Sequence, residues 1–129
     1  MAYFISHWII SLSSFLFLGL LAMALHETGH LLTSLMVGVK VKGIGLRMKG
    51  IYIVREAGTP VKNLLVSLAG PLTNVALLLL FWHASETFVL ANMCFAVCNL
   101  APVKGSDGDR ALDCLLLMQK NAEAAGKTN

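Results

Sequence analysis

The feature that most restricts the fold of this chain is an apolar run at its start that carries almost no charge. No residue from Ile9 to Leu25 is charged, the apolar character resumes from Leu31 to Val37, and Glu27 is the one charged residue among the first 39. As a single helix, residues 9–37 would be about 43 Å long, which exceeds the roughly 30 Å hydrocarbon core of a bilayer. The run therefore predicts a transmembrane helix that tilts or extends beyond the membrane. A cleaved signal peptide is disfavoured, because no Lys or Arg precedes the run and its hydrophobicity continues past Ala22-Met23-Ala24.

Four further segments complete the expected path of the chain. Residues 61–82 form a second apolar helix, in which Pro71 predicts a kink or local break because it has no amide hydrogen. Residues 87–101 form a third apolar helix, short for a full span. Residues 109–120 have the pattern of an amphipathic C-terminal helix, with a polar tail after it. Residues 39–56 are rich in Gly and then β-branched, which predicts a small hairpin at the membrane interface.

The composition agrees with a membrane protein. Hydrophobic residues make up 57% of the 129 residues and charged residues 13%, whereas soluble domains carry about 25% charged residues. The net charge of +3 does not indicate nucleic-acid binding, because the Lys and Arg lie in two short stretches, 40–62 and 104–127. Under the positive-inside rule these stretches are cytoplasmic and the N-terminus is outside. We therefore expect a single all-α membrane domain, 1–129, with three core transmembrane helices, an interfacial hairpin and a cytoplasmic C-terminal helix.

The sequence His26-Glu27-Thr28-Gly29-His30 places reactive groups within the first helix. Histidines four residues apart lie on one helical face, about 6 Å apart along the axis, which suits two imidazoles on one Zn²⁺. Glu27 can take a proton from a water that the zinc activates, as in the H-E-x-x-H pattern of zinc peptidases. Ionisable groups are costly in lipid, so a functional site is expected here. A purely structural zinc site is the alternative, and it would need a fourth protein ligand.

Two imidazoles leave the metal in need of a third protein ligand. The candidates are His7, His83, Glu56, Glu86, the three cysteines, Asp107, Asp109 and Asp113. His26 lies about 26 Å along the helix from Ile9, towards the cytoplasmic side, which disfavours the outer candidates. Asp107 and Asp109 both follow the third helix on that side. Gly108 would permit a sharp turn that brings Asp107 near the metal, and Asp109 begins the next helical pattern, so the residues alone leave both aspartates as candidates.

Three segments of the chain together resemble the site-2 proteases, a family of intramembrane zinc metalloproteases. They are His26-Glu27-Thr28-Gly29-His30, Ala69-Gly70-Pro71-Leu72-Thr73-Asn74, and Asn99-Leu100-Ala101-Pro102 followed by Asp107-Gly108. The resemblance extends from about Ile9 to Leu116. It implies that His26, His30 and Asp107 bind zinc, that Glu27 is the general base, and that Asn74 helps to hold the substrate or the developing oxyanion. It also implies that residues 39–56 dock the substrate as an added strand. Lys104, Gly105 and Asp109 depart from the family, in which many members have a Pro-rich stretch before the Asp and a second Gly after it.

These features predict an intramembrane zinc endopeptidase that cleaves peptide bonds in or near transmembrane segments of other proteins. The alternative is a non-catalytic membrane protein that binds transmembrane helices, but binding alone does not need the base Glu27. Asn74 has an alternative role as a buried amide that hydrogen-bonds a partner helix. Cys94 and Cys98 are expected to pack as small hydrophobic residues. Tyr52 and Trp82 are expected at membrane interfaces, and the basic residues of 40–62 facing solvent or anionic lipid.

Overall fold

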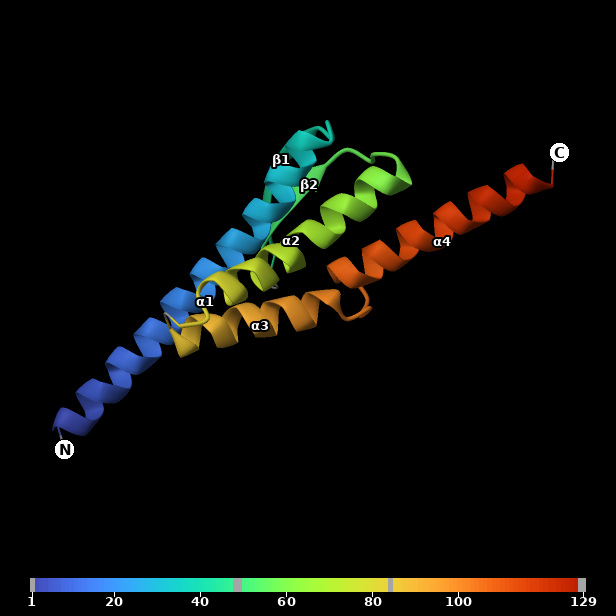
Figure 1. The fold of residues 1–129 in the computed structure, drawn as a ribbon. Coiled ribbons are helices and arrows are strands. Elements are labelled where there is room, and N and C mark those ends of the chain that lie inside the picture. The colour runs from blue at the N-terminus through green and yellow to red at the C-terminus, as the bar shows by residue number, and fades with distance from the viewer. Residues whose placement is uncertain (1, 48–49, 84, 128–129) are drawn as a thin grey trace.

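The computed structural model describes residues 2–47, 50–83 and 85–127, and the side chains of 12–45, 52–83 and 85–127. The described chain is mostly helical, with a small two-stranded antiparallel sheet. In chain order the elements are α1 (Ala2–Met36), β1 (Val41–Arg47), β2 (Gly50–Arg55), α2 (Pro60–Leu80), α3 (Glu86–Leu100) and α4 (Asp107–Gly126), shown in Figure 1.

Hydroxyl side chains begin three of the helices. Thr59, Ser85 and Ser106 each precede a helix and accept a hydrogen bond from the backbone N–H three residues later, the usual geometry of an N-cap. Helix α1 ends at Gly38, which has a φ of 69°. Here the Val39 N–H donates to the Ser34 carbonyl at 2.8 Å and the Gly38 N–H donates to the Leu35 carbonyl at 3.2 Å. This is a Schellman ending, which favours glycine because the backbone is left-handed.

The hairpin expected between the first two helices is confirmed. Strands β1 and β2 pair in an antiparallel register that includes Ile44 opposite Ile53 and Arg47 opposite Gly50. Residues 48 and 49, where the turn is expected, lie outside the described residues. The ring of Tyr52 lies against Gly45, where an added Cβ would come within 2.6 Å of the ring atoms. A glycine on β1 is thus what allows the Tyr52 ring to lie across the strand.

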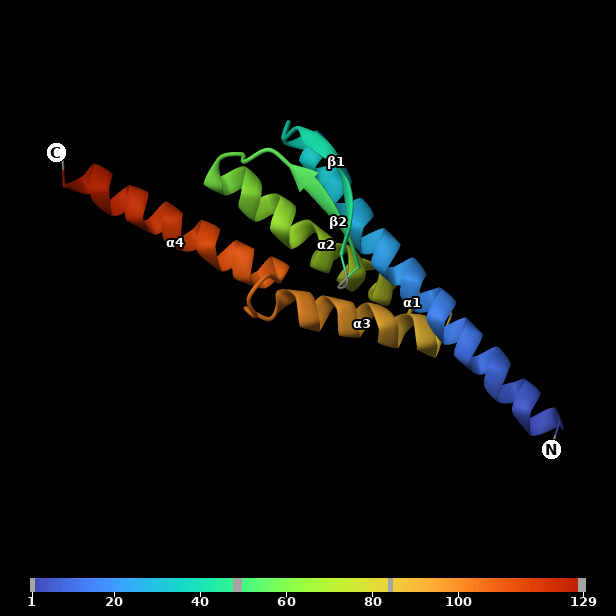
Figure 2. The same cartoon turned by 180° about the vertical axis from the view of Figure 1, so that it is seen from behind.

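Helix α2 is the centre of the packing. It contacts α1, α3 and α4, and the hairpin lies beside the C-terminal half of α1, as the views of Figures 1 and 2 show from opposite sides. Ala22, Phe88 and Ala91 form a small buried cluster between α1 and α3. The C-terminal part of helix α4 extends away from the other helices, so that the two termini lie at opposite ends of the molecule.

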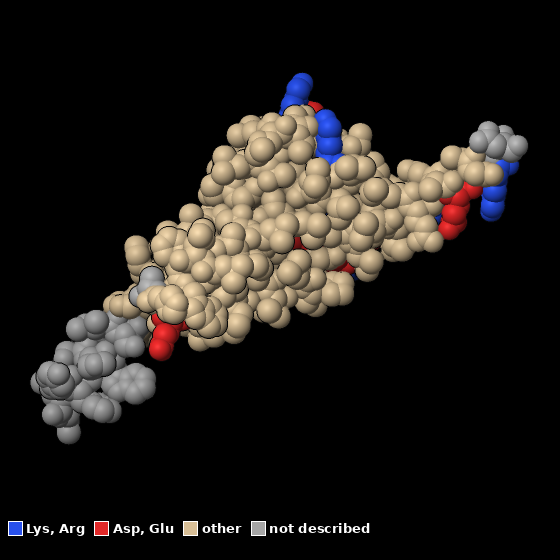
Figure 3. All heavy atoms as spheres, viewed as in Figure 1, with Lys and Arg blue, Asp and Glu red and all other residues tan. Residues whose placement is uncertain are grey.

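The polarity of the described side chains is inverted relative to a soluble domain. Phe17 and Leu79 are 66% and 67% exposed, and many other large apolar residues of α1, α2 and α3 are exposed as well. The buried polar or charged side chains are His26, His30, Ser34, Ser67, Asn74, Asn92 and Asp107. Over these helices the face in Figure 3 is mostly uncharged, and Lys and Arg gather at the hairpin end and near the end of α4. Two helices, Leu12–Met36 and Pro60–Leu80, are long and apolar enough to cross a membrane, and Glu86–Leu100 is shorter.

The local break considered at Pro71 and the expected bounds of the C-terminal helix are wrong. Helix α2 continues from Pro60 to Leu80 without a break at Pro71, because its middle is buried among other helices that hold it in place. The C-terminal helix is Asp107–Gly126 rather than 109–120. It begins earlier because Ser106, and not Asp109, is its N-cap, and it ends later because the polar tail is rich in alanine, a strong helix former.

Candidate metal centre

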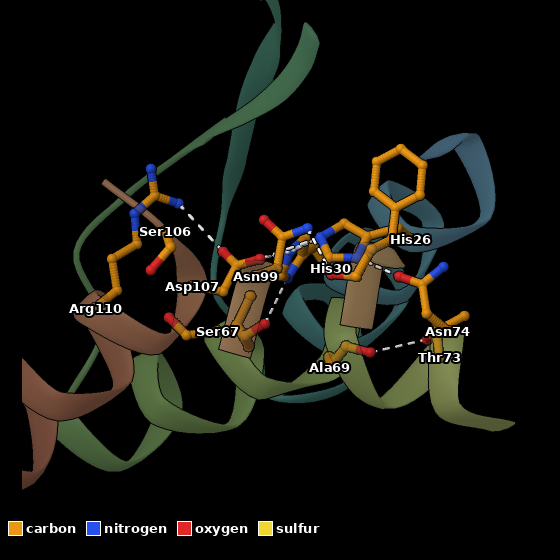
Figure 4. A network of polar contacts seen from close by, with 12 residues as sticks. His26, His30, Ser67, Ala69, Thr73, Asn74, Asn99, Ser106, Asp107 and Arg110 are labelled. Carbon is orange, nitrogen blue, oxygen red and sulfur yellow. Dashed lines mark hydrogen bonds and ion pairs between the residues drawn. The ribbon is translucent and has the colours of Figure 1, made fainter. Parts of the chain in front are cut away.

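Three potential ligand atoms meet at one point between α1 and α4 (Figure 4). The Oδ2 of Asp107 lies 3.1 Å from the Nε2 of His26 and 3.1 Å from the Nε2 of His30. The two Nε2 atoms are 3.2 Å apart. Neighbouring ligands of a tetrahedral zinc ion, with bonds of about 2.0–2.1 Å, lie about 3.3 Å from one another. The three atoms therefore have the spacing of ligands on one metal ion.

The other nitrogen of each imidazole faces an acceptor. The Nδ1 of His26 donates to the Oδ1 of Asn74 at 2.5 Å, and the Nδ1 of His30 donates to the Val66 carbonyl at 2.6 Å. The amide of Asn74 cannot be reversed, because its Nδ2 donates to the Ala22 carbonyl and to Asn92. Each neutral imidazole thus has its proton on Nδ1 and a lone pair on Nε2. Lone pairs of two imidazoles and a carboxylate converge with no proton between them, which fits a bound cation.

Asp107 supplies a negative charge to this centre. The residue is 6% exposed. Its second carboxylate oxygen, Oδ1, lies 3.7 Å from Nη1 of Arg110. The positive charge of Arg110 beside it favours the ionised form of this carboxyl. Asp107 is therefore a carboxylate at neutral pH, with one oxygen towards the imidazoles and the other towards Arg110.

Glycines make the close packing around the centre possible. A Cβ on Gly70 would lie 2.7 Å from the Nε2 of His26 and would also overlap His30. Ser67, Gly70 and Asn74 are all buried, so they form one small, polar face of α2 directed at other helices. Gly108 is needed for a different reason from the one expected, since its φ is not positive. An added Cβ there would lie within 3.0 Å of the Ala101 carbonyl and overlap that of Leu100.

Glu27 lies beside the imidazoles on the open side of the centre. It is half-buried and lines two cavities, one of about 640 Å³ that also reaches His26 and Asp107, and one of about 40 Å³. No hydrogen bond to its carboxylate is present within the described part of the chain. The ligand atoms of His26, Glu27 and His30 lie within 4.8 Å of one another and could themselves hold a metal. Asp107 lies closer to both imidazoles, at 3.1 Å, so it is better placed than Glu27 to be a third ligand.

The other candidates for the third ligand lie elsewhere or are engaged. The carboxylate of Asp109 accepts from the Gly105 N–H at 2.8 Å, and its own N–H donates to Ser106, so Asp109 belongs to the cap of α4 as expected. Glu56 pairs with Lys42 at 3.6 Å. His83, Glu86, Asp113, Cys94 and Cys98 are exposed, and Cys114 is partly exposed. The side chain of His7 lies outside the described residues.

The position of Asn74 differs from the one that the family resemblance implies. Asn74 is 0% exposed, and both ends of its amide are used inside the protein, by His26 on one side and by Ala22 and Asn92 on the other. It lies behind His26 and not in the open cavity, so the arrangement favours an orienting role over contact with a substrate. Asn92 accepts from Asn74 and donates to the Phe88 carbonyl. The sequence indicates this role only through the presence of an amide in an apolar helix.

Residues of the hairpin and α4 lie nearer to the centre than the sequence indicates. Tyr52, expected at a membrane interface, lines both cavities beside Glu27. Arg55, expected to face solvent or lipid, is half-buried, with its Nη2 3.5 Å from the Ser67 hydroxyl. Arg110 lines both cavities as well. Only the packing of β2 against α1 and of α4 against α2 brings these three residues together.

No model of a known protein family matches this chain, and no curated protein matches its sequence.

Proposed function

We propose that this protein is an intramembrane zinc endopeptidase of the site-2 protease type, which hydrolyses peptide bonds in or near the transmembrane segment of another protein. The observation that supports this most directly is the convergence of His26, His30 and Asp107 at 3.1–3.2 Å. Glu27 next to them is not needed for metal binding, and its position on the open cavity is that of a base. A structural zinc site would need a fourth protein ligand.

The residues divide into metal ligands and a proton carrier. His26, His30 and Asp107 hold the zinc, which supplies Lewis-acid chemistry by polarising the scissile carbonyl and making water more acidic. Glu27 takes a proton from the attacking water as its oxygen adds to the carbonyl carbon. Glu27 then passes that proton to the amide nitrogen as the C–N bond breaks, so that a carboxyl and an amine result. Asn74 and the Val66 carbonyl keep both imidazoles oriented.

The inverted polarity supports a place within the bilayer. Helices α1 and α2 have the length and composition of spans, and α3 adds a third, shorter crossing. Under the positive-inside rule, the basic residues of 40–62 and 104–127 favour a cytoplasmic hairpin and α4, with the N-terminus outside. The metal centre, near the C-terminal half of α1, then lies closer to the cytoplasm, from which water reaches it.

The larger cavity is the place for the substrate. This cavity has a volume of about 640 Å³. Its walls are formed by His26, Glu27 and Asp107, by Tyr52 of β2, and by the segment that joins α3 to α4. A peptide bond within a helix is shielded by its own hydrogen bonds, so the substrate unwinds before cleavage. The hairpin has open edges that can hold the unwound segment as an added strand.

A cleavage assay tests this proposal. The purified full chain in lipid vesicles is given a panel of single-pass membrane proteins, with and without a zinc chelator, and its metal content is measured. We expect one zinc per chain and cleavage of at least one substrate that stops with chelator and returns with zinc. Binding of the substrates without cleavage by zinc-loaded protein would instead indicate the non-catalytic helix-binding protein.

A further inference from the structure

The smaller cavity beside Glu27 has a lining that the proposed chemistry does not use. It has a volume of about 40 Å³ and lies between α1, β2 and α4. Its walls are Glu27, His30, Ser34, Tyr52, Ile53, Arg55 and Arg110. It shares Glu27, Tyr52 and Arg110 with the larger cavity, so a chain in the larger cavity passes close to it.

Two guanidinium groups line this small cavity: Arg110 is paired with Asp107 at 3.7 Å, whereas Arg55 has no ion pair within the described chain. Arg55 is half-buried. Within the described chain, the one hydrogen bond of its guanidinium group is the 3.5 Å contact between Nη2 and the Ser67 hydroxyl. No carboxylate lies within ion-pair distance of Arg55 in that part of the chain. Burial and the positive charge of Arg110 lower the pKa of Arg55, although the charges of Asp107 and Cys114 act in the opposite direction. Two like charges held together in this way favour a bound anion.

Ser34 provides a second, independent observation. Its side chain is 0% exposed, it lines the small cavity, and its hydroxyl is the one buried side-chain oxygen or nitrogen that has no hydrogen-bond partner among the described residues. A buried hydroxyl without a partner is unfavourable unless a ligand or water satisfies it. Ser34 lies four residues after His30, so its hydroxyl is one helical turn from the metal centre.

The size and charge of the cavity select a small anion. A volume of about 40 Å³ has room for only a few atoms, such as the three heavy atoms of a carboxylate. The wall has two positive groups, Arg55 and Arg110, against one negative group, Glu27. The carboxylate of Asp107 is already engaged by both imidazoles and by Arg110. Guanidinium groups bind carboxylates through paired N–H donors, and a hydroxyl adds a further donor.

We propose that Arg55, Arg110 and Ser34 form a subsite that binds the side-chain carboxylate of an Asp or Glu in the substrate, close to the scissile bond. The identity of the ligand as a substrate residue rests on the proposed function, whereas the binding of a carboxylate by the subsite does not. The subsite makes the cleavage selective for transmembrane proteins with an acidic residue near the point of cleavage.

The first test measures carboxylate binding without any catalysis. The chain has three arginines, Arg47, Arg55 and Arg110, so the Nε–Hε region of its arginine-labelled NMR spectrum contains three resonances, assigned with single Arg→Lys variants. The full chain in micelles is titrated with N-acetyl-glutamate α-amide and, as control, with N-acetyl-glutamine α-amide. We expect saturable shifts of the Arg55 and Arg110 resonances with the acid only, and weaker binding in Ser34→Ala. Equal shifts of all three resonances, or none, would overturn the subsite.

The second test measures selectivity. Cleavable substrates are made in matched pairs with Glu or Gln at each position near the scissile bond, and kcat/KM is compared for the wild type, Arg55→Gln and the exposed control Lys120→Gln. We expect one position at which Glu is preferred by about tenfold, a preference that Arg55→Gln abolishes and Lys120→Gln retains. Cleavage with no acidic preference at any position would overturn the subsite but leave the protease intact. Arginine shifts in a protein that cleaves nothing would support the subsite and contradict the protease.

Discussion

A single buried amide determines how His26, a proposed metal ligand, is oriented. The Oδ1 of Asn74 accepts the Nδ1 proton of His26, and its Nδ2 is held by the Ala22 carbonyl and by Asn92. His26 therefore cannot turn its ring or move its proton to Nε2 without breaking this set of contacts. The Val66 carbonyl has the same effect on His30. Outer contacts of this kind commonly change metal affinity by about 10- to 100-fold.

Replacing Asn74 by alanine tests this orienting role against a role in substrate binding. We expect Asn74→Ala to lower zinc affinity by about 10- to 100-fold, measured by competition with a chelating dye, because His26 is no longer held in one tautomer. At saturating zinc the KM for a cleaved substrate should stay close to that of the wild type. The exposed residue Asn121 provides the control, Asn121→Ala. A raised KM with unchanged zinc affinity would show that Asn74 contacts the substrate.

The two neighbouring aspartates make a matched pair. Asp107→Asn removes the anionic ligand, so we expect it to lose both zinc and cleavage. Asp109→Asn weakens the cap of α4 but leaves the centre intact, so it should keep its zinc and lose on the order of 1 kcal/mol in the free energy of unfolding. Zinc content by mass spectrometry and denaturant unfolding separate the two effects. Zinc kept in the first variant and lost in the second would reverse the assignment.

The residues of the centre differ in how well the sequence predicts them. Helical periodicity alone places His26 and His30 on one face with Glu27 beside them. The family resemblance, the neighbouring Gly108 and the capping role of Asp109 favour Asp107 over Asp109, and the structure brings Asp107 to the imidazoles. Arg55 and Ser34 could not be identified in this way, because their meeting depends on how β2 packs against α1. No local pattern encodes that contact.

At the level of elements, the helices follow from long apolar runs, but their ends depend on individual side chains. The start of α4 at Asp107 reflects the hydroxyl of Ser106, which accepts from the Asp109 N–H at 3.1 Å. The continuity of α2 through Pro71 reflects burial on several sides, a property of the assembled bundle. The hairpin, by contrast, is predicted from the glycines and β-branched residues of 39–56, since strand pairing between neighbouring segments is a local feature.

The role of the hairpin as a docking edge can be tested on β1. Ile44 is 70% exposed, so Ile44→Ala should have little effect on stability or on cleavage. Ile44→Pro removes a backbone donor from the strand, and we expect it to reduce cleavage more than it reduces zinc content. Circular dichroism checks that the helices persist. An equal loss of zinc and cleavage would mean that the hairpin supports the centre and does not dock the substrate.

For the molecule as a whole, the account depends on which side of a membrane each end occupies. After replacement of the three native cysteines by serine or alanine, single cysteines are introduced at His83, Lys42 and Ala122, which are all exposed. Position 83 should react with an impermeant thiol reagent from outside the cell, and positions 42 and 122 only after the membrane is opened. The neighbouring Ser85 is not replaced, because its side chain caps α3. Labelling of position 42 from outside would invert the topology and the route of water.

The central claim is that this bundle holds a zinc ion for hydrolysis, with Glu27 as its base. The most direct measurement takes Glu27→Gln and the wild type through the same preparation, and determines zinc content and substrate cleavage on each sample. Because Glu27 is not a ligand in this account, the variant should retain one zinc per chain and its thermal stability. Its kcat should fall by about 10²- to 10⁴-fold, the usual contribution of a general base. Cleavage by the variant at a rate close to the wild type, or loss of its zinc, would contradict the account.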